Sequence, residues 1–308
     1  MLLVSYTHDG GAAPRLGVRR DDTDPAVIDV AALTAAHGDR IPGLGSAPAS
    51  VLDVIHAGPE AVAALTELLA GPVPEAALRA AADVTLAAPL RPGKIVGVGL
   101  NYTEHVAESA RTLDTDNALP QRPVLFSKPA TAVTGPGAPV LHNGDLTAQL
   151  DWECELAVVI GRTARRVRPE DAIDHVFGYS IVNDISARDQ RRSGQWFYSK
   201  GQDSYAPFGP AVRTAATVPD PHALDLSLRV NGEVKQKSNT RYMLFRIPEL
   251  IADITAGMTL EPGDVIATGS PAGVGASFVP QQFLTPGDIV EATIATIGTL
   301  RNPVVDAR

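Results

Sequence analysis

The segment that most constrains this chain runs from Leu150 to Gly161 and reads Leu-Asp-Trp-Glu-Cys-Glu-Leu-Ala-Val-Val-Ile-Gly. Its second half, residues 156–160, is apolar and rich in β-branched residues, which predicts a strand in a sheet core. Because side chains alternate along a strand, Glu153 and Glu155 share one face. Two neighbouring carboxylates on a core strand repel each other and resist desolvation. The segment therefore indicates either a strand end in water or a cation held between the two carboxylates.

Composition limits the classes of protein to which this chain can belong. The 308 residues suggest about two domains or one large domain. A net charge of -9 argues against a general binder of nucleic acid or anionic membranes. No run of 18 or more apolar residues predicts a membrane span, and the first ten residues do not resemble a signal peptide. The single cysteine, Cys154, excludes an intrachain disulfide, so we expect a cytoplasmic protein.

Residues 1–90 are expected to form a small N-terminal α/β domain, and residues 91–308 a larger catalytic domain. Short strand candidates in the N-terminal part, separated by Gly, Asp and Pro, are residues 2–6, 16–19 and 27–30. Helix candidates are residues 51–57 after the cap Ser50, residues 59–71 opening at Pro59, and an Ala-rich run opening at Pro74. We find no catalytic constellation in this part.

The strand candidate at residues 94–98 leads into a segment whose side chains can perform acid–base chemistry. Asn101 and Glu104 fit a capping box that starts a short helix. On that helix, His105 and Glu108 are three residues apart and share a face. A carboxylate beside an imidazole orients the ring and raises its basicity, as a general base requires. An ordinary exposed helix face is the alternative interpretation.

A third carboxylate follows the strand predicted over residues 179–182. Asp184 lies at the end of that strand, where it could cap a helix over residues 186–192 or join the two glutamates in one site. Lys200 lies in a later loop, and the glycine-rich run at residues 267–275 is suited to bringing backbone close to a ligand.

Together these segments resemble the fumarylacetoacetate hydrolase family. Each match is modest alone, but five in the family's order are specific. The matching segments are residues 94–108, 150–161, 178–189, 195–210 and 263–275. The resemblance implies a β-rich α+β fold. A small N-terminal α/β domain comes first in the chain, and a mixed β-sheet roll with a metal at its open end follows it. The resemblance also implies a homodimer.

The resemblance assigns the acidic residues to a metal. The family's ligands fall on Glu153, Glu155 and Asp184. Three hard oxygen ligands without histidine or cysteine suit Mg²⁺, with Mn²⁺ or Ca²⁺ as alternatives. Of the two interpretations of the opening segment, the resemblance therefore favours the cation.

The resemblance also assigns catalytic and substrate-binding positions. The family's His-x-x-Glu dyad falls on His105 and Glu108, and its active-site lysine falls on Lys200. Positions that lie near the substrate in relatives fall on Arg188, Thr268 and Gly269. The chain departs from the family's common residues around this pocket, at Gln190-Arg191, Tyr198-Ser199 and Gly201-Gln202. These departures put the substrate in question but leave the metal ligands unaffected.

These parts predict hydrolysis of a carbon–carbon bond in a small acylpyruvate, a 2,4-dioxo acid. The ion would act as a Lewis acid for an enolate, Lys200 would add positive charge near its oxygen, and His105 with Glu108 would activate a water. The alternative is a metal-dependent decarboxylase or isomerase of a 2-oxo or 2-hydroxydienoic acid, either oxaloacetate-like or 2-hydroxyhepta-2,4-diene-1,7-dioate-like. Neither reaction needs an attacking water.

Two readings from other classes are weaker. A binding protein without activity is disfavoured because every candidate catalytic side chain is present. A nucleotide-dependent oxidoreductase is disfavoured because Gly97 and Gly99 lack the third glycine and the later acidic residue of the dinucleotide motif.

Overall fold

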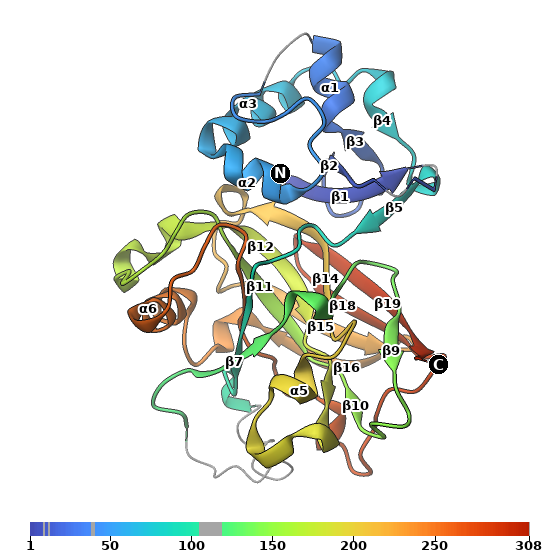
Figure 1. The fold of residues 1–308 in the computed structure, drawn as a ribbon, viewed down its shortest axis with the longest axis vertical. Helices are drawn as coiled ribbons and strands as arrows, with labels where there is room; N and C mark the ends of the chain where they lie inside the picture. The colour runs from blue at the N-terminus through green and yellow to red at the C-terminus, as the bar shows by residue number, and fades with distance from the viewer. Residues whose placement is uncertain (9, 12, 38–40, 105–118, 308) are drawn as a thin grey trace.

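The computed structural model describes residues 1–8, 10–11, 13–37, 41–104 and 119–307. An upper lobe contains the N-terminal strands and helices, and a larger lower lobe contains most of the remaining strands (Figure 1). The mixture of many strands, mixed sheets and few helices confirms the predicted β-rich α+β class.

A 12-stranded mixed sheet runs through both lobes of the described chain. Its main path is β4-β3-β2-β1-β14-β12-β11-β17-β6-β7, while β5 pairs with β1 and β8 with β14. The strands are β1 Leu2–His8, β2 Arg15–Arg19, β3 Val27–Asp29, β4 Leu78–Arg79, β5 Val84–Ala87, β6 Ile95–Gly99, β7 Val124–Lys128, β8 Val133–Thr134, β11 Cys154–Ile160, β12 Val176–Asn183, β14 Ala206–Thr214 and β17 Val265–Ala267. Because β1 pairs with β14, backbone hydrogen bonds join the two lobes. A domain boundary at residue 90 stays a prediction.

Strand β11 lies between β12 and β17 near the middle of this sheet, and all of its residues are buried. On one face, Leu156 and Val158 pack into one apolar cluster. On the other face, Ala157 and Val159 pack into a second cluster. The alternation predicted from the sequence is therefore confirmed, and it places Glu155 on the same face as Ala157.

A five-stranded sheet, in the order β16-β15-β18-β19-β9, lies beside the large one. The predicted hairpin turn at Asn231 and Gly232 is confirmed, because both residues have the positive φ that this turn requires, 51° and 81°. Its strands are β9 Val140–His142, β15 Asp225–Val230, β16 Glu233–Asn239, β18 Ile289–Ile294 and β19 Gly298–Asp306. A two-stranded sheet pairs β10 (Leu150–Asp151) with β13 (Ser186–Ala187).

The helices of the upper lobe are α1 (Val30–His37), α2 (Val51–Ala57) and α3 (Pro59–Ala70). The starts predicted for α2 and α3 are confirmed. The third helix, predicted after Pro74, is wrong. Two 3₁₀ turns, Glu75–Ala77 and Ala81–Asp83, instead flank β4, which pairs with β3. Edge pairing, with an ion pair from Arg79 to the buried Asp29, outweighs the helix propensity of alanine.

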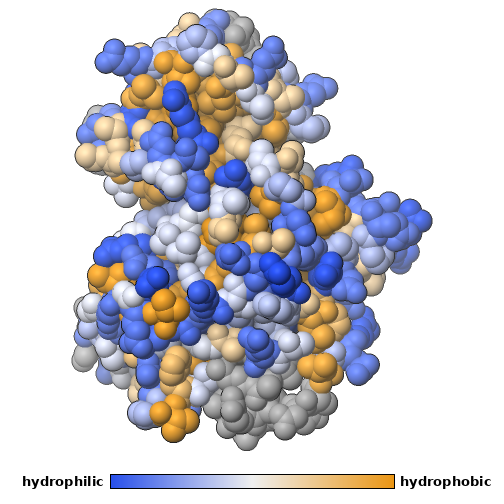
Figure 2. All heavy atoms as spheres, turned by 180° about the vertical axis from the view of Figure 1, so that it is seen from behind, coloured by the Kyte–Doolittle hydropathy of each residue, from blue (hydrophilic) through white to orange (hydrophobic). Residues whose placement is uncertain are grey.

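Within the described part of the lower lobe, the helices are α5 (Phe197–Lys200) and α6 (Ile247–Gly257). Its 3₁₀ turns are Ala130–Ala132, Pro169–His175, Arg188–Gln190, Arg192–Gly194, Ala215–Thr217, Thr240–Tyr242 and Gly275–Ser277. Across the described ranges, no helix combines the length and apolar character that a membrane crossing needs. From behind, hydrophobic residues gather most densely on the upper lobe and are more scattered on the lower one (Figure 2).

Candidate metal and substrate site

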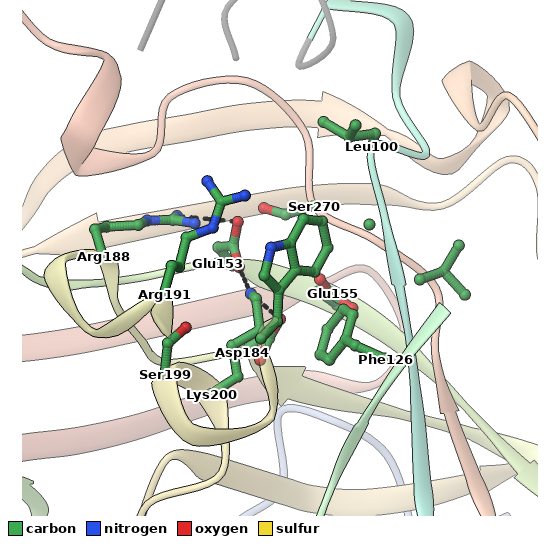
Figure 3. A pocket seen from close by; sticks show the side chains of 13 residues that line it. Leu100, Phe126, Glu153, Glu155, Asp184, Arg188, Arg191, Ser199, Lys200 and Ser270 are labelled. Carbon is green, nitrogen blue, oxygen red and sulfur yellow. Dashed lines mark hydrogen bonds and ion pairs between the residues drawn. The ribbon is translucent and has the colours of Figure 1, made fainter. Parts of the chain in front are cut away.

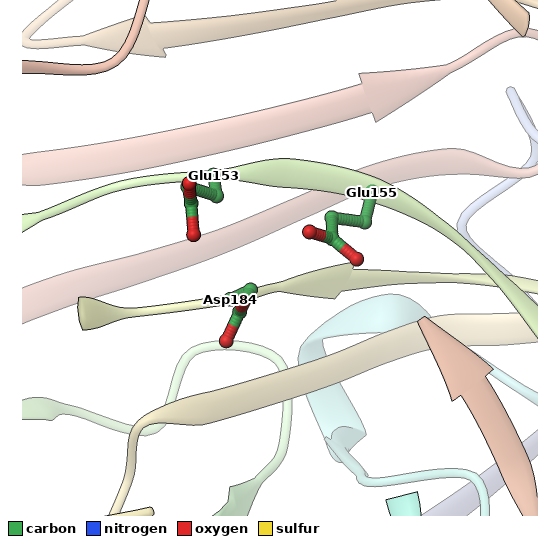
Figure 4. A group of neighbouring side chains, drawn as sticks. All are labelled: Glu153, Glu155 and Asp184. Carbon is green, nitrogen blue, oxygen red and sulfur yellow. The ribbon is translucent and has the colours of Figure 1, made fainter. Parts of the chain in front are cut away.

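Three acidic side chains meet where β11 begins and β12 ends. Glu153 precedes β11, Glu155 lies within it, and Asp184 directly follows β12. The N–H of Asp184 donates to the carbonyl of Glu153 over 2.8 Å, which holds the two strand ends together. One carboxylate oxygen of each residue lies within 4.8 Å of the others, and no residue of the three is more than 4% exposed. All three side chains project to one side of the strands (Figure 4).

Asp184 does not cap a helix, which was the alternative interpretation of its position. Residues Ser186–Ala187 form β13, and short 3₁₀ turns follow it. The carboxylate of Asp184 is instead paired with two buried lysines, Lys128 on β7 and Lys200 at the end of α5. Its place in the acidic cluster is thus set by the end of a core strand.

Lys200 links two of the three acidic residues. Its ammonium forms ion pairs with Glu153 and Asp184 and donates to the hydroxyl of Ser186 over 2.7 Å. The lysine is 6% exposed, so these contacts take place almost without solvent. Lys128 is fully buried and donates to the carbonyl of Ile185 over 3.1 Å as well as to Asp184.

Arg188 extends this network to a fourth buried carboxylate. Its Nε donates to Asp151 over 2.8 Å and its Nη2 donates to Glu153 over 3.0 Å. Asp151 also accepts hydrogen bonds from the N–H groups of Gly275 and Ala276, at 2.6 and 3.0 Å. The arginine therefore connects the acidic strand to the loop after β17.

Burial and charge move the pKa values of this cluster in different directions. Burial, together with the charges of Asp184 and Glu153, raises the pKa of Glu155 well above its ordinary value. Burial lowers the pKa of Lys128 to about 8, although Asp184 acts in the opposite direction. Burial would also lower the pKa of Lys200, but the carboxylates of Asp184 and Glu153 outweigh it and raise that pKa. Lys200 therefore stays a cation at neutral pH.

The cluster has the charge and the ligand types that a divalent cation requires. Among the residues that the structure describes, four buried carboxylates (Asp151, Glu153, Glu155, Asp184) face three buried cations (Lys128, Arg188, Lys200). Glu155 is the least compensated, since among the described residues it accepts one hydrogen bond, from the N–H of Gly269 over 2.9 Å. A buried, uncompensated carboxylate is costly. Hard oxygen ligands in this number fit Mg²⁺, Mn²⁺ or Ca²⁺.

A small pocket opens beside the carboxylates. Figure 3 shows Arg188, Arg191 and Lys200 reaching it from the segment after β13, with Phe126 near Glu155. The residues that line it are Val98, Gly99, Leu100, Phe126, Glu153, Glu155, Asp184, Arg188, Arg191, Trp196, Ser199, Lys200 and Ser270. Charged side chains thus line one part of the pocket, and apolar and aromatic side chains line another.

The predicted substrate positions are distributed unevenly around this pocket. Arg188 lines it. Thr268 does not, because its buried hydroxyl donates to the carbonyl of Leu156 over 2.9 Å. Gly269 supplies the N–H that binds Glu155 and has a φ of +99°, which favours glycine. Contact of these residues with a substrate stays a prediction.

The predicted base and its partner, His105 and Glu108, lie outside the described residues. The chain before them reaches the pocket, because Leu100 is one of its lining residues. The side chain of Asn101, whose capping of that helix stays a prediction, binds backbone from two other segments. It accepts from the N–H of Phe245 over 2.7 Å and donates to the carbonyl of Thr268 over 2.7 Å.

Sequence reasoning assigned no role to several residues of the site, among them Lys128, Asp151, Trp196 and Ser270. Lys128 had a usable signal, because a lysine that ends the apolar run Val-Leu-Phe-Ser-Lys invites a search for a buried partner. Arg191 and Trp196 lie on a segment without periodicity, so their convergence depends on the folded chain.

Comparisons with known proteins agree with this geometry. The family model described as fumarylacetoacetate (FAA) hydrolase C-terminal matches residues 94–305. Oxaloacetate tautomerase YisK of Bacillus subtilis is 46% identical over 225 residues, covering 72% of this chain and 73% of YisK. A fumarylacetoacetate hydrolase from psychrophilic Exiguobacterium antarcticum has a TM-score of 0.80 and 37% identity, covering 100% of both chains. A maleylpyruvate hydrolase from Sphingobium sp. SYK-6, in complex with manganese(II) and pyruvate, has a TM-score of 0.78 and 31% identity, also covering 100% of both chains.

Proposed function

Because this chain belongs to the fumarylacetoacetate hydrolase family, we propose that it is a metal-dependent isomerase. Its reaction is the interconversion of the keto and enol forms of a small, oxaloacetate-like 2-oxo acid. The similarity to an oxaloacetate tautomerase supports this alternative better than the acylpyruvate hydrolase predicted first from the sequence. The observation that carries the proposal is the acidic cluster of Glu153, Glu155 and Asp184, with Lys200 beside it in a pocket.

The proposed roles follow from the contacts of each residue. Glu153, Glu155 and Asp184 would hold a divalent ion, with Mg²⁺ as the first candidate and Mn²⁺ or Ca²⁺ as alternatives. When bound, that ion supplies a Lewis acid for the negative charge that develops on a 2-oxo acid as it enolises. Lys200 stays protonated and adds a second positive charge to the same place.

Keto–enol conversion also needs a proton to leave and return at C3. We assign this step to His105, oriented by Glu108, because an imidazole with a carboxylate partner exchanges protons readily at neutral pH. Lys200 is poorly suited to it, because its raised pKa keeps it protonated. We also propose that the enzyme acts in the cytoplasm as a homodimer.

A direct test follows the ultraviolet absorbance of enol-oxaloacetate with added Mg²⁺ and then with excess EDTA. The expected result is accelerated, metal-dependent loss of the enol without release of pyruvate or CO₂. Glu155→Gln with the same Mg²⁺ serves as the control, because free metal ions also promote enolisation. No acceleration above this control would contradict the isomerase proposal.

Hydrolysis of an acylpyruvate is the second candidate. It is supported by the similarity to the maleylpyruvate hydrolase, whose structure contains manganese(II) and pyruvate. The same assay with a small acylpyruvate distinguishes the two, since hydrolysis releases stoichiometric pyruvate and isomerisation does not. CO₂ released from oxaloacetate would instead indicate a decarboxylase with the same ligands.

A further inference from the structure

Lys128 is a buried cation beside the acidic cluster, and the proposed function leaves it without a role. It is the last residue of β7, and its side chain is fully buried. Its ammonium forms an ion pair with Oδ1 of Asp184 and donates to the carbonyl oxygen of Ile185 over 3.1 Å. Because the second contact is to backbone, the ammonium is fixed next to the carboxylate that it binds.

The two oxygens of the Asp184 carboxylate face different surroundings. Oδ2 is bound by Lys200, whose ammonium also binds Oε2 of Glu153. Oδ2 therefore lies on the side of Glu153, and these three residues line the pocket (Figure 3). Lys128 is not among the described residues that line it. The oxygen that Lys128 holds, Oδ1, is thus turned toward the protein interior.

This division of the carboxylate affects which metal ion fits the site. Mg²⁺ requires a near-octahedral set of ligands, whereas Ca²⁺ accepts more ligands and often takes both oxygens of one carboxylate. A carboxylate with one oxygen held by a buried ammonium can offer only its other oxygen to an ion. Residues that hold metal ligands in this way orient them and tune the affinity for the metal.

We infer that Lys128 is a positioning residue of the metal site, which keeps Oδ1 of Asp184 away from the ion and thereby favours Mg²⁺ over Ca²⁺. The inference rests on the metal ligands of the proposed function but not on its reaction. Lys128 acts through Asp184 and touches neither the ion nor the substrate. In this it differs from Lys200, which lines the pocket.

The test compares the affinities of the wild-type protein and of Lys128→Met for the two ions. Mn²⁺ is bound first, and its displacement by Mg²⁺ or by Ca²⁺ is followed through the EPR signal of free Mn²⁺. Loss of a positive charge affects both divalent ions alike, so the ratio of their affinities isolates the effect of position. We expect the preference for Mg²⁺ over Ca²⁺ to fall about tenfold in Lys128→Met. An unchanged ratio would overturn the inference, even if both affinities changed.

The matched control is Lys94→Met. Lys94 also forms an ion pair with a buried aspartate, Asp264, but neither residue lines the pocket. Its substitution is expected to leave the ratio of the two affinities unchanged. An equal fall of the ratio in both variants would overturn the inference, because the effect would then not depend on the oxygen that Lys128 holds.

A second measurement needs no variant, so it remains decisive if Lys128→Met does not fold. A crystal structure of the wild-type protein with Mn²⁺ is expected to show Asp184 on the ion through Oδ2 alone, with the ammonium of Lys128 still on Oδ1. Both oxygens on the ion, or a displaced Lys128, would overturn the inference.

Failure of this inference can be distinguished from failure of the proposed function. A wild-type protein that binds Mg²⁺ but does not isomerise a 2-oxo acid loses the proposed reaction, and the role of Lys128 is still decided by the ratio. A protein that isomerises normally but keeps its ratio in Lys128→Met loses this inference alone. A wild-type protein that binds no divalent ion would overturn both.

Discussion

The two halves of the pocket are built in different ways. Lys128, Glu155 and Asp184 lie on or directly beside core strands, where the pairing of β7 with β6 and of β11 with β12 fixes their positions. Residues 188–200 instead form short 3₁₀ turns and one four-residue helix, and Arg192 to Gln195 are exposed. A strand register allows little variation, whereas such a segment tolerates it. The strands are thus suited to a common reaction and the segment to a particular substrate.

The largest effect is expected from Glu155→Gln on the strand side. Loss of one charged ligand should lower metal-dependent turnover by more than about a hundredfold, since even changes beyond the ligands cost tenfold to a hundredfold. Without metal, the variant should be more stable than the wild type, because a buried carboxylate with one hydrogen bond becomes a neutral amide. Thermal unfolding in EDTA and in Mg²⁺ checks both statements.

Glu170→Gln is the control, because Glu170 is an exposed acid whose side chain is 62% accessible. It should keep the wild-type response to Mg²⁺. If Glu155→Gln still gained stability on addition of Mg²⁺ as the wild type does, Glu155 would not be a ligand, and the strand half would lose its assigned role.

A smaller effect, about a hundredfold on kcat, is expected from Lys200→Met. Lys200 belongs to the segment by sequence, but its ammonium lies among the strand carboxylates. Its removal should lower the rate without weakening the metal, because a cation that competes for Glu153 and Asp184 is lost. Metal titration by calorimetry together with steady-state kinetics measures the two quantities separately.

Lys237→Met provides the comparison for Lys200→Met, since Lys237 is exposed on β16, outside the pocket. Weaker metal binding in Lys200→Met, parallel to its loss of rate, would show that the lysine supports the ligands structurally. Lys200 would then belong to the strand half of the pocket both by its position and by its role.

The same division explains what the sequence could predict. The Glu-x-Glu strand, its alternation of faces and the hairpin at Asn231 follow from local patterns that the tertiary structure reinforces. The acidic cluster was implied by the family resemblance, and the fold explains it, because two neighbouring strand ends meet there. Glu153 and Asp184 are 31 positions apart in the chain, yet the pairing of Cys154 with Asn183 brings them together.

The parts that could not be predicted depend on contacts distant in sequence. The run after Pro74 has the alanines of a helix, but β3 provides an edge that it completes as a strand. Trp196 lines the pocket because it packs against Phe126, which is 70 positions earlier. No local pattern encodes such a contact, so Arg191 on the Trp196 ring was visible only in the folded chain.

Ser186 joins the two halves and should show the smallest of these effects. Its hydroxyl accepts from Lys200 over 2.7 Å and lies 3.1 Å from Glu153 Oε2 and 2.9 Å from the carbonyl of Asp184, to either of which it can donate. Ser186→Ala should cost about 1 kcal/mol of unfolding free energy, the usual net value of such a hydrogen bond, and about fivefold in kcat. Urea unfolding and steady-state kinetics measure these values.

Ser277→Ala is the matched comparison, because its hydroxyl donates to the carbonyl of Val274 over 2.6 Å but does not line the pocket. It should lose similar stability and no activity. If Ser186→Ala, like Ser277→Ala, lost stability but kept its activity, Lys200 would keep its position without help from β13. The two halves of the pocket would then be held independently. A loss of kcat in Ser186→Ala would instead mean that Ser186 on β13 fixes the position of the Lys200 ammonium. The strand half of the pocket would then control part of the chemistry of residues 188–200.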